Sequence, residues 1–346
     1  MSPSSPWRRL RPVLLLLFVM LAGGAGAAPD CPGAHGALSF PYALTPPPGW
    51  EHDRFAPQGG ETVTIRDAAF TAAFTDPGRA DPASPYQGLP RWVAYEMRAL
   101  RDADGHPVAP AGARRPRHWY ELEQTAALWR DRPGIERAGL DWAYRGVATR
   151  WNRGHLAARA HADRLGWAAG CNSHVFVNAV PEQARLNQGE WEALENYAAA
   201  VANRFGRVWT IAGPLFVPGR PVETIGGAGV VPLAVPHALF KILAIETAAG
   251  LEARAFLFPQ DGAYHRCVAT PQDSYDFALF AVPLAELERM TGLRFFPLLS
   301  PAARAALEAA GAAPPWPVAA EAYSARCGPR PPAEGEEQSA RIINPE

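Results

Sequence analysis

Lysine is almost absent from this sequence: Lys241 is the only one, and arginine supplies every other strongly basic side chain. Lysine and arginine together number 33, aspartate and glutamate 34, and the sequence has no long block of one sign. This balance excludes binding to nucleic acid through bulk positive charge. Any contact with a phosphate backbone must therefore use a local group of arginines.

Cysteine is also scarce. The four cysteines are Cys31, Cys171, Cys267 and Cys327. None belongs to a C-x-x-C pair, which argues against a zinc site. An even number of cysteines in an exported chain favours two disulfide bonds, and four cysteines allow three pairings.

Only one long apolar run is present, residues 13–21, and it is too short for a membrane-spanning helix with ordinary flanks. It follows three arginines: Arg8, Arg9 and Arg11. Small residues come next, so we predict a signal peptide over residues 1–27 and a secreted or periplasmic protein; an uncleaved anchor is the alternative. Cleavage after Ala27 would change the net charge from −1 to −4 and leave no membrane contact.

Strands and helices are predicted without a regular βαβ rhythm, which favours an α+β fold. Alternating or apolar runs predict strands at residues 63–75, 90–100, 174–180, 207–213, 231–246 and 251–259. Helical spacing predicts helices at residues 187–206 and 283–292. In the first helix the apolar positions are Trp191, Leu194, Ala198, Val201 and Phe205, and Gly206 is a stop signal.

Four segments are predicted along the chain. The signal peptide is followed by an irregular Pro- and Gly-rich segment at residues 28–65, and then by one folded domain at residues 66–312. Residues 313–346 form a C-terminal extension, in which the composition after Gly328 is typical of a disordered tail.

His155 is the first candidate for chemistry. A lone histidine is more often structural than catalytic, but Arg153 lies beside it, and Asn178 and Asn187 follow about thirty residues later. Asparagine oxygen is a suitable ligand for a hard divalent cation. A base for water, a metal and an arginine together are typical of phosphodiester cleavage.

Six fragments then carry a resemblance, in this order: RPRHW, NRGHLAARA, HVFVNAVPEQARLNQGEWEALE, WTIAGPLF, VPHALFKILA and AVPLAELERMTGLRFF. In the same order they resemble the R-P-R-x-W, D-R-G-H, N-x-x-P-Q with L-N-Q-x-x-W-x-x-L-E, T-G-P-L-[FY], V-P-x-x-[FY]-[FW]-K-V and I-E-x-x-T-G-L segments of the DNA/RNA non-specific endonuclease family. The fragments run from Arg115 to Phe296, about half of the chain. The resemblance implies a ββα-metal (His-Me finger) core on a mixed, largely antiparallel sheet flanked by helices.

The resemblance also assigns roles. His155 matches the general base that deprotonates the attacking water. Asn187 matches the single direct protein ligand of a Mg²⁺ ion, for which Mn²⁺ could substitute, and Glu195 matches the carboxylate that orients metal-bound waters. Asn178 and Arg153 match positions that support the metal and the phosphate.

Two further positions are assigned to substrate binding, Arg117 in the upstream loop and Asn152. Asn152 departs from the family, which has aspartate before Arg-Gly-His, and this change removes one negative charge near the metal. Ala199 departs as well, because the family often has an arginine there, one helical turn after the glutamate. Arg185 or Arg204 could replace that arginine.

Two geometric expectations follow from the predicted elements. Asn187 and Glu195 are eight residues apart, so on one helix they would differ by about 80° in azimuth and two turns in height. On a strand, His174, Phe176 and Asn178 would share one face.

These observations predict an exported, Mg²⁺-dependent endonuclease that binds DNA and RNA through phosphate contacts and leaves 5′-phosphate and 3′-hydroxyl ends. Contacts to phosphate and sugar rather than to base edges would make it non-specific. Asn152 and Ala199 motivate one alternative, a catalytically impaired nucleic-acid-binding protein on the same fold. A metal phosphodiesterase with another substrate is the second alternative.

The resemblance also suggests how the cysteines pair. Some secreted relatives have a bridge from the segment before the late helix to the C-terminal end, which by approximate position is Cys267–Cys327. Cys31 and Cys171 are then left to pair, and their bond would join the irregular N-terminal segment to the loop between His155 and the predicted helix.

Overall fold

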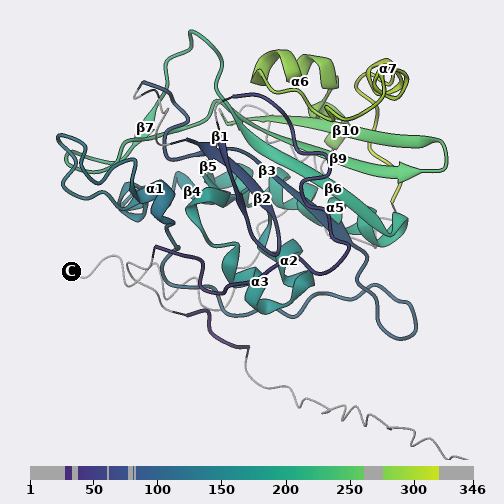
Figure 1. The fold of residues 1–346 in the computed structure, drawn as a ribbon, viewed down its shortest axis with the longest axis horizontal. Helices are drawn as coiled ribbons and strands as arrows, with labels where there is room; N and C mark the ends of the chain where they lie inside the picture. Colours follow the sequence, from purple (N-terminus) through teal and green to yellow (C-terminus); the bar gives the residue numbers. More distant parts are fainter. Residues whose placement is uncertain are drawn as a thin grey trace, which may run out of the picture.

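The computed structural model describes residues 28–32, 38–60, 62–76, 81, 83–260 and 276–318. Its main element is a seven-stranded sheet in the order β1-β2-β3-β6-β9-β10-β11, in which every pairing is antiparallel (Figure 1). The strands are β1 (Thr62–Arg66), β2 (Thr71–Thr75), β3 (Pro90–Arg98), β6 (Arg207–Leu215), β9 (Ala238–Thr247), β10 (Gly250–Pro259) and β11 (Ala281–Val282). Two hairpins lie outside this sheet: β4 (Trp151–His155) with β5 (Ala179–Gln183), and β7 (Thr224–Ile225) with β8 (Leu233–Ala234). The predicted α+β class is confirmed.

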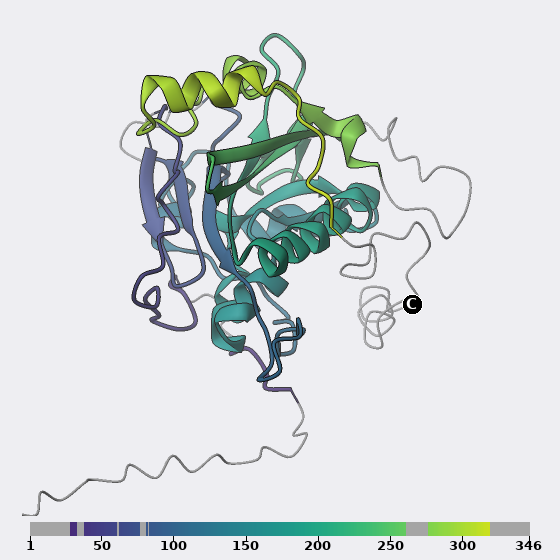
Figure 2. The same ribbon diagram turned by 90° about the vertical axis from the view of Figure 1, so that its right-hand side faces the viewer.

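Helices cover both faces of the sheet. They are α1 (Glu123–Ala126), α2 (Arg159–Ala162), α3 (Trp167–Asn172), α4 (Ala184–Asn187), α5 (Glu190–Phe205), α6 (Leu284–Thr291) and α7 (Pro301–Ala309). α5 contributes to the larger hydrophobic core and α6 and α7 to a second core, and Figure 2 shows them on opposite sides of the sheet. Among the described residues, no helix combines the length and the apolar character needed to span a membrane.

β9 shows how the sequence divides between the two cores. Phe240 and Ile242 belong to the core under α6 and α7, whereas Leu239 and Leu243 belong to the core under α5. Successive side chains of a strand point to opposite faces. Lys241, between Phe240 and Ile242, therefore points to the α5 side, where it is fully buried.

Two predicted strands are in fact divided. Residues 63–75 form the hairpin β1–β2, because the Asp67 carboxylate accepts the backbone N–H of Ala69 and the Asp67 backbone closes a turn with Phe70. Residues 231–246 form β8 and β9 instead of one strand. Proline cannot donate a ladder hydrogen bond, and Pro236 lies between the two.

The predicted strand at residues 174–180 is also wrong in its first half. Phe176–Asn178 form a 3₁₀ turn, and β5 starts only at Ala179. The expectation that His174, Phe176 and Asn178 share one strand face therefore fails. The Asn178 side chain stabilises the turn by donating to the Ser173 carbonyl at 2.9 Å.

The predicted helix at residues 187–206 is interrupted. α4 ends at Asn187 and α5 begins at Glu190, after Gly189 with φ −124° and ψ −109°, a backbone conformation that is not helical. Asn187 and Glu195 thus lie on two helices, and the expected azimuth of one continuous helix does not apply. The predicted stop at Gly206 is confirmed, with φ 87°, and Phe205 is exposed rather than part of the core.

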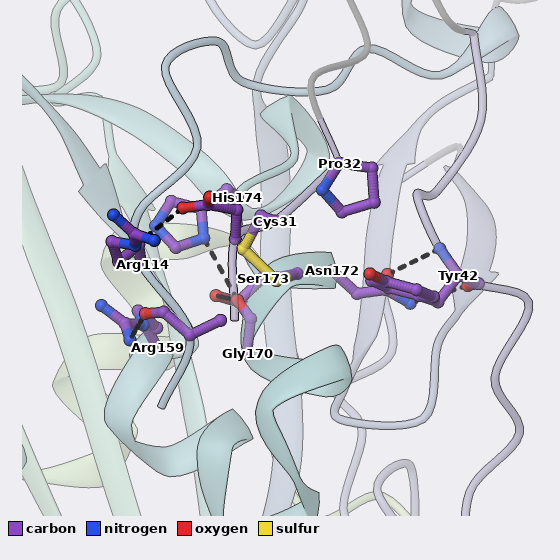
Figure 3. Close-up of a disulfide and its surroundings, with 12 residues drawn as sticks. Cys31, Pro32, Tyr42, Arg114, Arg159, Gly170, Asn172, Ser173 and His174 are labelled. Atoms are coloured by element: carbon purple, nitrogen blue, oxygen red, sulfur yellow. Dashed lines mark hydrogen bonds and ion pairs between the residues drawn. A yellow bond between two sulfur atoms is a disulfide. The ribbon is translucent and has the colours of Figure 1, made fainter. Parts of the chain in front are cut away.

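A disulfide bond joins Cys31 to Cys171 across 140 residues, as the resemblance suggested (Figure 3). Neighbouring contacts strengthen this attachment of the N-terminal segment, since Asp30 pairs with Arg114 at 2.8 Å and the Tyr120 hydroxyl donates to the Pro32 carbonyl. The second predicted pair, Cys267–Cys327, lies outside the described residues.

Candidate active site

The β4–β5 hairpin and the helices that follow it, α4 and α5, form a ββα unit on the α5 side of the sheet. In the hairpin Asn152 lies opposite Glu182, Gly154 opposite Val180 and His155 opposite Ala179. Within this unit, the hairpin is joined to α5 by a hydrogen bond from Trp191 Nε1 to the carbonyl of His155 at 3.0 Å.

His155 is the last residue of β4 and packs among aromatic rings. Its ring lies 4.5 Å from the ring of Trp119 and 4.8 Å from that of His174. Its Nε2 is buried and has no hydrogen-bond partner within the described part of the chain. Burial lowers the pKa of His155 well below its ordinary value, and the positive charges of neighbours such as Arg115 act in the same direction. At neutral pH the imidazole is therefore unprotonated and available as a base.

Asn178 is fully buried and uses its side chain to hold the chain around His155. Its Oδ1 accepts the backbone N–H of Ala157 at 2.7 Å, and its Nδ2 donates to the carbonyls of Ala157 and Ser173, each at 2.9 Å. Its backbone carbonyl accepts the N–H of Leu156. These bonds position the turn after His155, so Asn178 belongs to the site as a positioning residue.

The structure brings Asn152 and Asn187 together. Asn187 Nδ2 donates to Asn152 Oδ1 at 3.0 Å, and Gln188 Nε2 donates to the same oxygen at 3.2 Å. Asn152 Nδ2 in turn donates to the Ala148 carbonyl at 2.9 Å. These bonds connect β4 to the break between α4 and α5, and they leave Asn187 Oδ1 free of intramolecular partners in the described residues.

Glu195 on α5 forms an ion pair with Lys241 on β9, at 3.1 Å between Oε1 and Nζ. The Lys241 ammonium also lies 3.9 Å from the ring centroid of Trp191, a cation–π contact. Burial raises the pKa of Glu195, whereas the charge of Lys241 opposes that shift. His161 supports this position, because its Nε2 lies 2.9 Å from the Glu195 carbonyl and its Nδ1 lies 2.9 Å from the Tyr95 hydroxyl.

Glu182 lies on the same face of the hairpin as Asn152 and is fully buried. A Cβ at Gly154 would come within 2.0 Å of Glu182 Oε2, so glycine is required there. Neither carboxylate oxygen has a hydrogen-bond partner among the described residues. Burial raises the pKa of Glu182 well above its ordinary value; the negative charge of Glu195 adds to this shift and Lys241 opposes it.

Arg153 is held by other groups. Its Nη2 pairs with Asp141 Oδ1 at 2.7 Å, and its guanidinium lies 5.1 Å from the ring centroid of Tyr144. By strand alternation Arg153 points away from the face that bears Asn152 and Glu182.

Arg117 is exposed, and no ion pair or hydrogen bond of its side chain is found in the part of the chain that the structure describes. Two other arginines, Arg115 and Arg159, are close enough to lower the pKa of His155. Arg159 also pairs with Asp163 at 3.2 Å. The positive charge near His155 thus comes from Arg115 and Arg159.

The structure does not replace the family arginine at Ala199 with either expected residue. Arg185 is exposed on α4, and Arg204 donates to the Pro317 carbonyl at the far end of α5. Arg164 does reach the Ala199 carbonyl at 3.4 Å, but it also donates to the Arg98 carbonyl at 2.6 Å. Its role there is therefore structural.

The oxygen-rich side chains of this unit suit a hard divalent cation, which prefers amide and carboxylate oxygens. The oxygen atoms left without hydrogen-bond partners, and therefore available as metal ligands, are Asn187 Oδ1 and the buried oxygens of Glu182. The residues present thus fit such an ion. Among the described residues, one other group has metal-ligand spacing: Asp102, Asp104 and His106. That group is exposed in the turn after β3, near the C-terminal end of α5, and has no features of a built site.

Four residues of the site were missed by reasoning from the sequence: Arg115, Trp119, Glu182 and Lys241. Lys241 had a signal, since it is the only lysine of the chain and interrupts an apolar strand. Arg115 and Trp119 stood in the quoted R-P-R-x-W fragment. Glu182 had only a weak signal, since it replaces the amide of the N-x-x-P-Q pattern, and a sequence does not indicate that a carboxylate is buried without partners.

Comparisons with known proteins identify a matching family model and similar proteins. The family model described as DNA/RNA non-specific endonuclease matches residues 83–302. The chain is 32% identical over 160 residues to endonuclease G, mitochondrial, of Homo sapiens. The aligned segment covers 44% of this chain and 50% of that protein. It is 31% identical over 163 residues to the mitochondrial nuclease EXOG of Homo sapiens, covering 44% and 42%.

A bacterial protein is similar over a longer stretch. The nuclease of Serratia marcescens is 28% identical over 206 residues, which covers 58% of this chain and 66% of that protein. The chain thus spans about half the length of the mitochondrial relatives it matches.

Proposed function

Because this chain belongs to the DNA/RNA non-specific endonuclease family, we propose that it is an exported endonuclease that uses Mg²⁺ to hydrolyse phosphodiester bonds of DNA and RNA. The products would carry 5′-phosphate and 3′-hydroxyl ends. The observation that carries this proposal is His155 in a ββα unit, with a buried Nε2 that has no hydrogen-bond partner in the described residues and with a pKa lowered by burial.

In this proposal His155 Nε2 accepts a proton from the water that attacks the phosphorus. Trp119 packs against the imidazole, and the side-chain amide of Asn178 holds the turn after His155 through its hydrogen bonds with the backbone of Ala157. Arg115 and Arg159 contribute positive charge for the phosphate, because both lie close enough to His155 to lower its pKa. Arg117, an exposed residue of the same loop as Arg115, would contribute a further positive charge. Contacts of this kind read no bases, which makes cleavage independent of sequence.

Asn187 would bind a Mg²⁺ or Mn²⁺ ion directly, and Glu195 would orient the waters around that ion. When bound, the ion stabilises negative charge on the phosphate and on the departing oxygen. Lys241 keeps Glu195 in one orientation through the 3.1 Å ion pair. Asn152 keeps Asn187 at the hairpin through the 3.0 Å hydrogen bond.

A nicking assay tests the proposal. Supercoiled plasmid and a structured RNA are incubated with the purified protein in Mg²⁺, in Mn²⁺ and in EDTA, and the ends of the products are analysed. We expect cleavage of both substrates with either metal and none in EDTA. Tight nucleic-acid binding without cleavage in any metal would instead support the impaired-enzyme alternative that Asn152 and Ala199 motivate.

Export is the second part of the proposal. It is supported by the predicted signal peptide over residues 1–27 and by the Cys31–Cys171 bond, since disulfides persist in oxidising compartments. N-terminal sequencing of the protein recovered from the periplasm or the medium is expected to begin at Ala28. Full-length protein confined to the reducing cytosol would contradict it.

A further inference from the structure

Glu182 is a buried carboxylate that the proposed reaction does not yet use. Its side chain has no exposure, and both of its oxygens lack a hydrogen-bond partner among the described residues. Buried charges in proteins are normally paired or bound to a metal. An unpaired carboxylate at this position therefore indicates a cation that binds beside it.

The carboxylate lies within the ββα unit. Glu182 is directly opposite Asn152 in the hairpin, and its Oε2 lies against Gly154, the residue before His155. Asn152 is in turn bonded to Asn187, the proposed metal ligand. The unpaired oxygens of Glu182 are thus on the hairpin face that also bears these two amides.

The charges nearby do not balance Glu182. Lys241 is the ammonium whose charge reaches it, but Lys241 already forms an ion pair with Glu195. The fully buried Glu182 and the partly buried Glu195 therefore share one cation. When both carboxylates are ionised, one negative charge remains unbalanced, and a divalent cation bound there would neutralise it.

The sequence pattern fits the same conclusion. The family pattern D-R-G-H has a carboxylate at the position of Asn152, and its N-x-x-P-Q pattern has a neutral amide at the position of Glu182. In this chain the two are exchanged between residues that face each other across the hairpin. The total charge on this face is preserved, while its position moves from β4 to β5.

We propose that Glu182 supplies the carboxylate of the divalent metal site in this chain, in place of an aspartate at position 152. This inference rests on the proposed function, since that function requires the metal. It makes Glu182 a further metal-site residue, on the strand that pairs with the strand of His155.

Direct metal binding tests it. Purified protein is titrated with Mn²⁺ and the free ion is followed by electron paramagnetic resonance, without substrate. We expect Glu182→Gln, which keeps the size of the side chain, to weaken Mn²⁺ binding by about 10- to 100-fold, the usual effect of removing a supporting group at a metal site. Asn152→Asp in the Glu182→Gln background is expected to restore at least part of the loss.

The matched control is Asp102→Asn, which removes a carboxylate from the exposed Asp102, Asp104 and His106 group and should leave the titration unchanged. Glu182→Asp, which keeps the charge, serves if Glu182→Gln does not fold, and it should bind Mn²⁺ more weakly than the wild type. The inference would be overturned if Glu182→Gln or Glu182→Asp bound Mn²⁺ with wild-type affinity. It would also be overturned if Asn152→Asp restored nothing, or if the wild type bound no Mn²⁺. Wild-type protein that binds Mn²⁺ through Glu182 but cleaves no nucleic acid would refute the proposed function and leave this inference intact.

Discussion

Glu96 and Glu182 are both buried glutamates on strands, yet their surroundings are opposite. Glu96 on β3 accepts hydrogen bonds from Arg207 Nε at 2.7 Å, from Arg98 Nε at 2.5 Å and from the backbone N–H of Glu51 at 2.6 Å. Burial would raise the pKa of Glu96, but these bonds lower it below its ordinary value. Glu182 has no such partner in the described residues, and burial raises its pKa.

The difference separates a region that stabilises the fold from the region of the candidate active site. Around Glu96 every acceptor is used, as expected for a group whose role is to join β3 to its neighbours. In the same ββα unit, the buried Nε2 of His155 and the partly exposed Oδ1 of Asn187 also lack partners in the described chain. Unsatisfied buried groups cost stability, so the unpaired atoms of Glu182 and His155 are the ones that ligands of the candidate site would complete.

The largest effect is expected from His155→Ala. Removal of a general base should lower the cleavage rate by about 10²–10⁴-fold, while the far-ultraviolet circular dichroism and the melting temperature stay close to those of the wild type. Plasmid nicking under single-turnover conditions measures the rate. A folded variant within about threefold of the wild-type rate would remove His155 from its assigned role. His106→Ala, in an exposed turn, is the matched control and should cleave normally.

Asn187→Ala should act mainly on the use of metal. Its side-chain oxygen is the unpaired amide oxygen of the site, so we expect the Mg²⁺ concentration for half-maximal cleavage to rise by about tenfold or more. The variant also loses the hydrogen bond to Asn152, and Gln188→Ala, which loses the other bond to the same oxygen, controls for that. A Mg²⁺ titration that coincides with that of the wild type would place the metal elsewhere.

How far the sequence predicts these two regions depends on the range of the interactions involved. The apolar spacing of α5 from Trp191 to Val201 is local and was predicted correctly, and the strand predicted at residues 231–246 contains most of β9. The break between α4 and α5 was not, because Asn187 and Gln188 are held there by Asn152, which is 35 residues away from Asn187. No local signal reports such a contact.

The same holds for the residues of the site. Short fragments such as NRGH and LNQ indicated His155 and Asn187, and the structure places them in one ββα unit. The 3₁₀ turn at Phe176–Asn178 was predicted as a strand because its residues alternate, but the Asn178 side chain bonds to Ala157 and redirects the chain. Side-chain bonds over long sequence separations thus decide what local periodicity cannot.

Glu96→Gln should have the reverse effect of His155→Ala. Loss of the charged hydrogen bonds should lower the free energy of unfolding by roughly 2 kcal/mol. The loss is not larger because Arg98 and Arg207 keep part of their contact with solvent. Cleavage should stay unchanged. Since the folded pKa of Glu96 is lowered, its stabilisation is present above the ordinary value of 4.5 and is lost as the pH falls through the folded pKa. Urea denaturation from pH 7 to pH 3 measures both effects. The variant should lose less stability than the wild type on acidification, and equal losses would contradict the prediction.

Glu182→Gln should not destabilise the metal-free protein. Because the wild type buries a carboxylate without a partner, the neutral amide should raise the free energy of unfolding by about 1 kcal/mol in EDTA at pH 8. Excess Mg²⁺ should then stabilise the wild type more than the variant, since a ligand stabilises the state to which it binds. Thermal unfolding with and without Mg²⁺ measures both differences. If the variant is much less stable than the wild type in EDTA, the Glu182 carboxylate stabilises the fold as Glu96 does, and the contrast between the two glutamates is wrong.

Asn152→Asp in the wild-type background is expected to have the smallest effect. The added carboxylate faces Glu182 across the hairpin, so its attraction for Mg²⁺ is partly offset by repulsion between the two like charges. It can still accept the hydrogen bonds from Asn187 and Gln188, but it loses the donor to the Ala148 carbonyl. We therefore expect the half-saturating Mg²⁺ concentration to fall by only about threefold, well below the change in Glu182→Gln, because one of the two carboxylates already supplies the charge. Asn152→Ala, which removes the same donor without adding charge, separates the two contributions. If Asn152→Asp cleaves more slowly than the wild type at every Mg²⁺ concentration, the site requires a neutral amide at position 152. A carboxylate at that position would then not assist the one at Glu182.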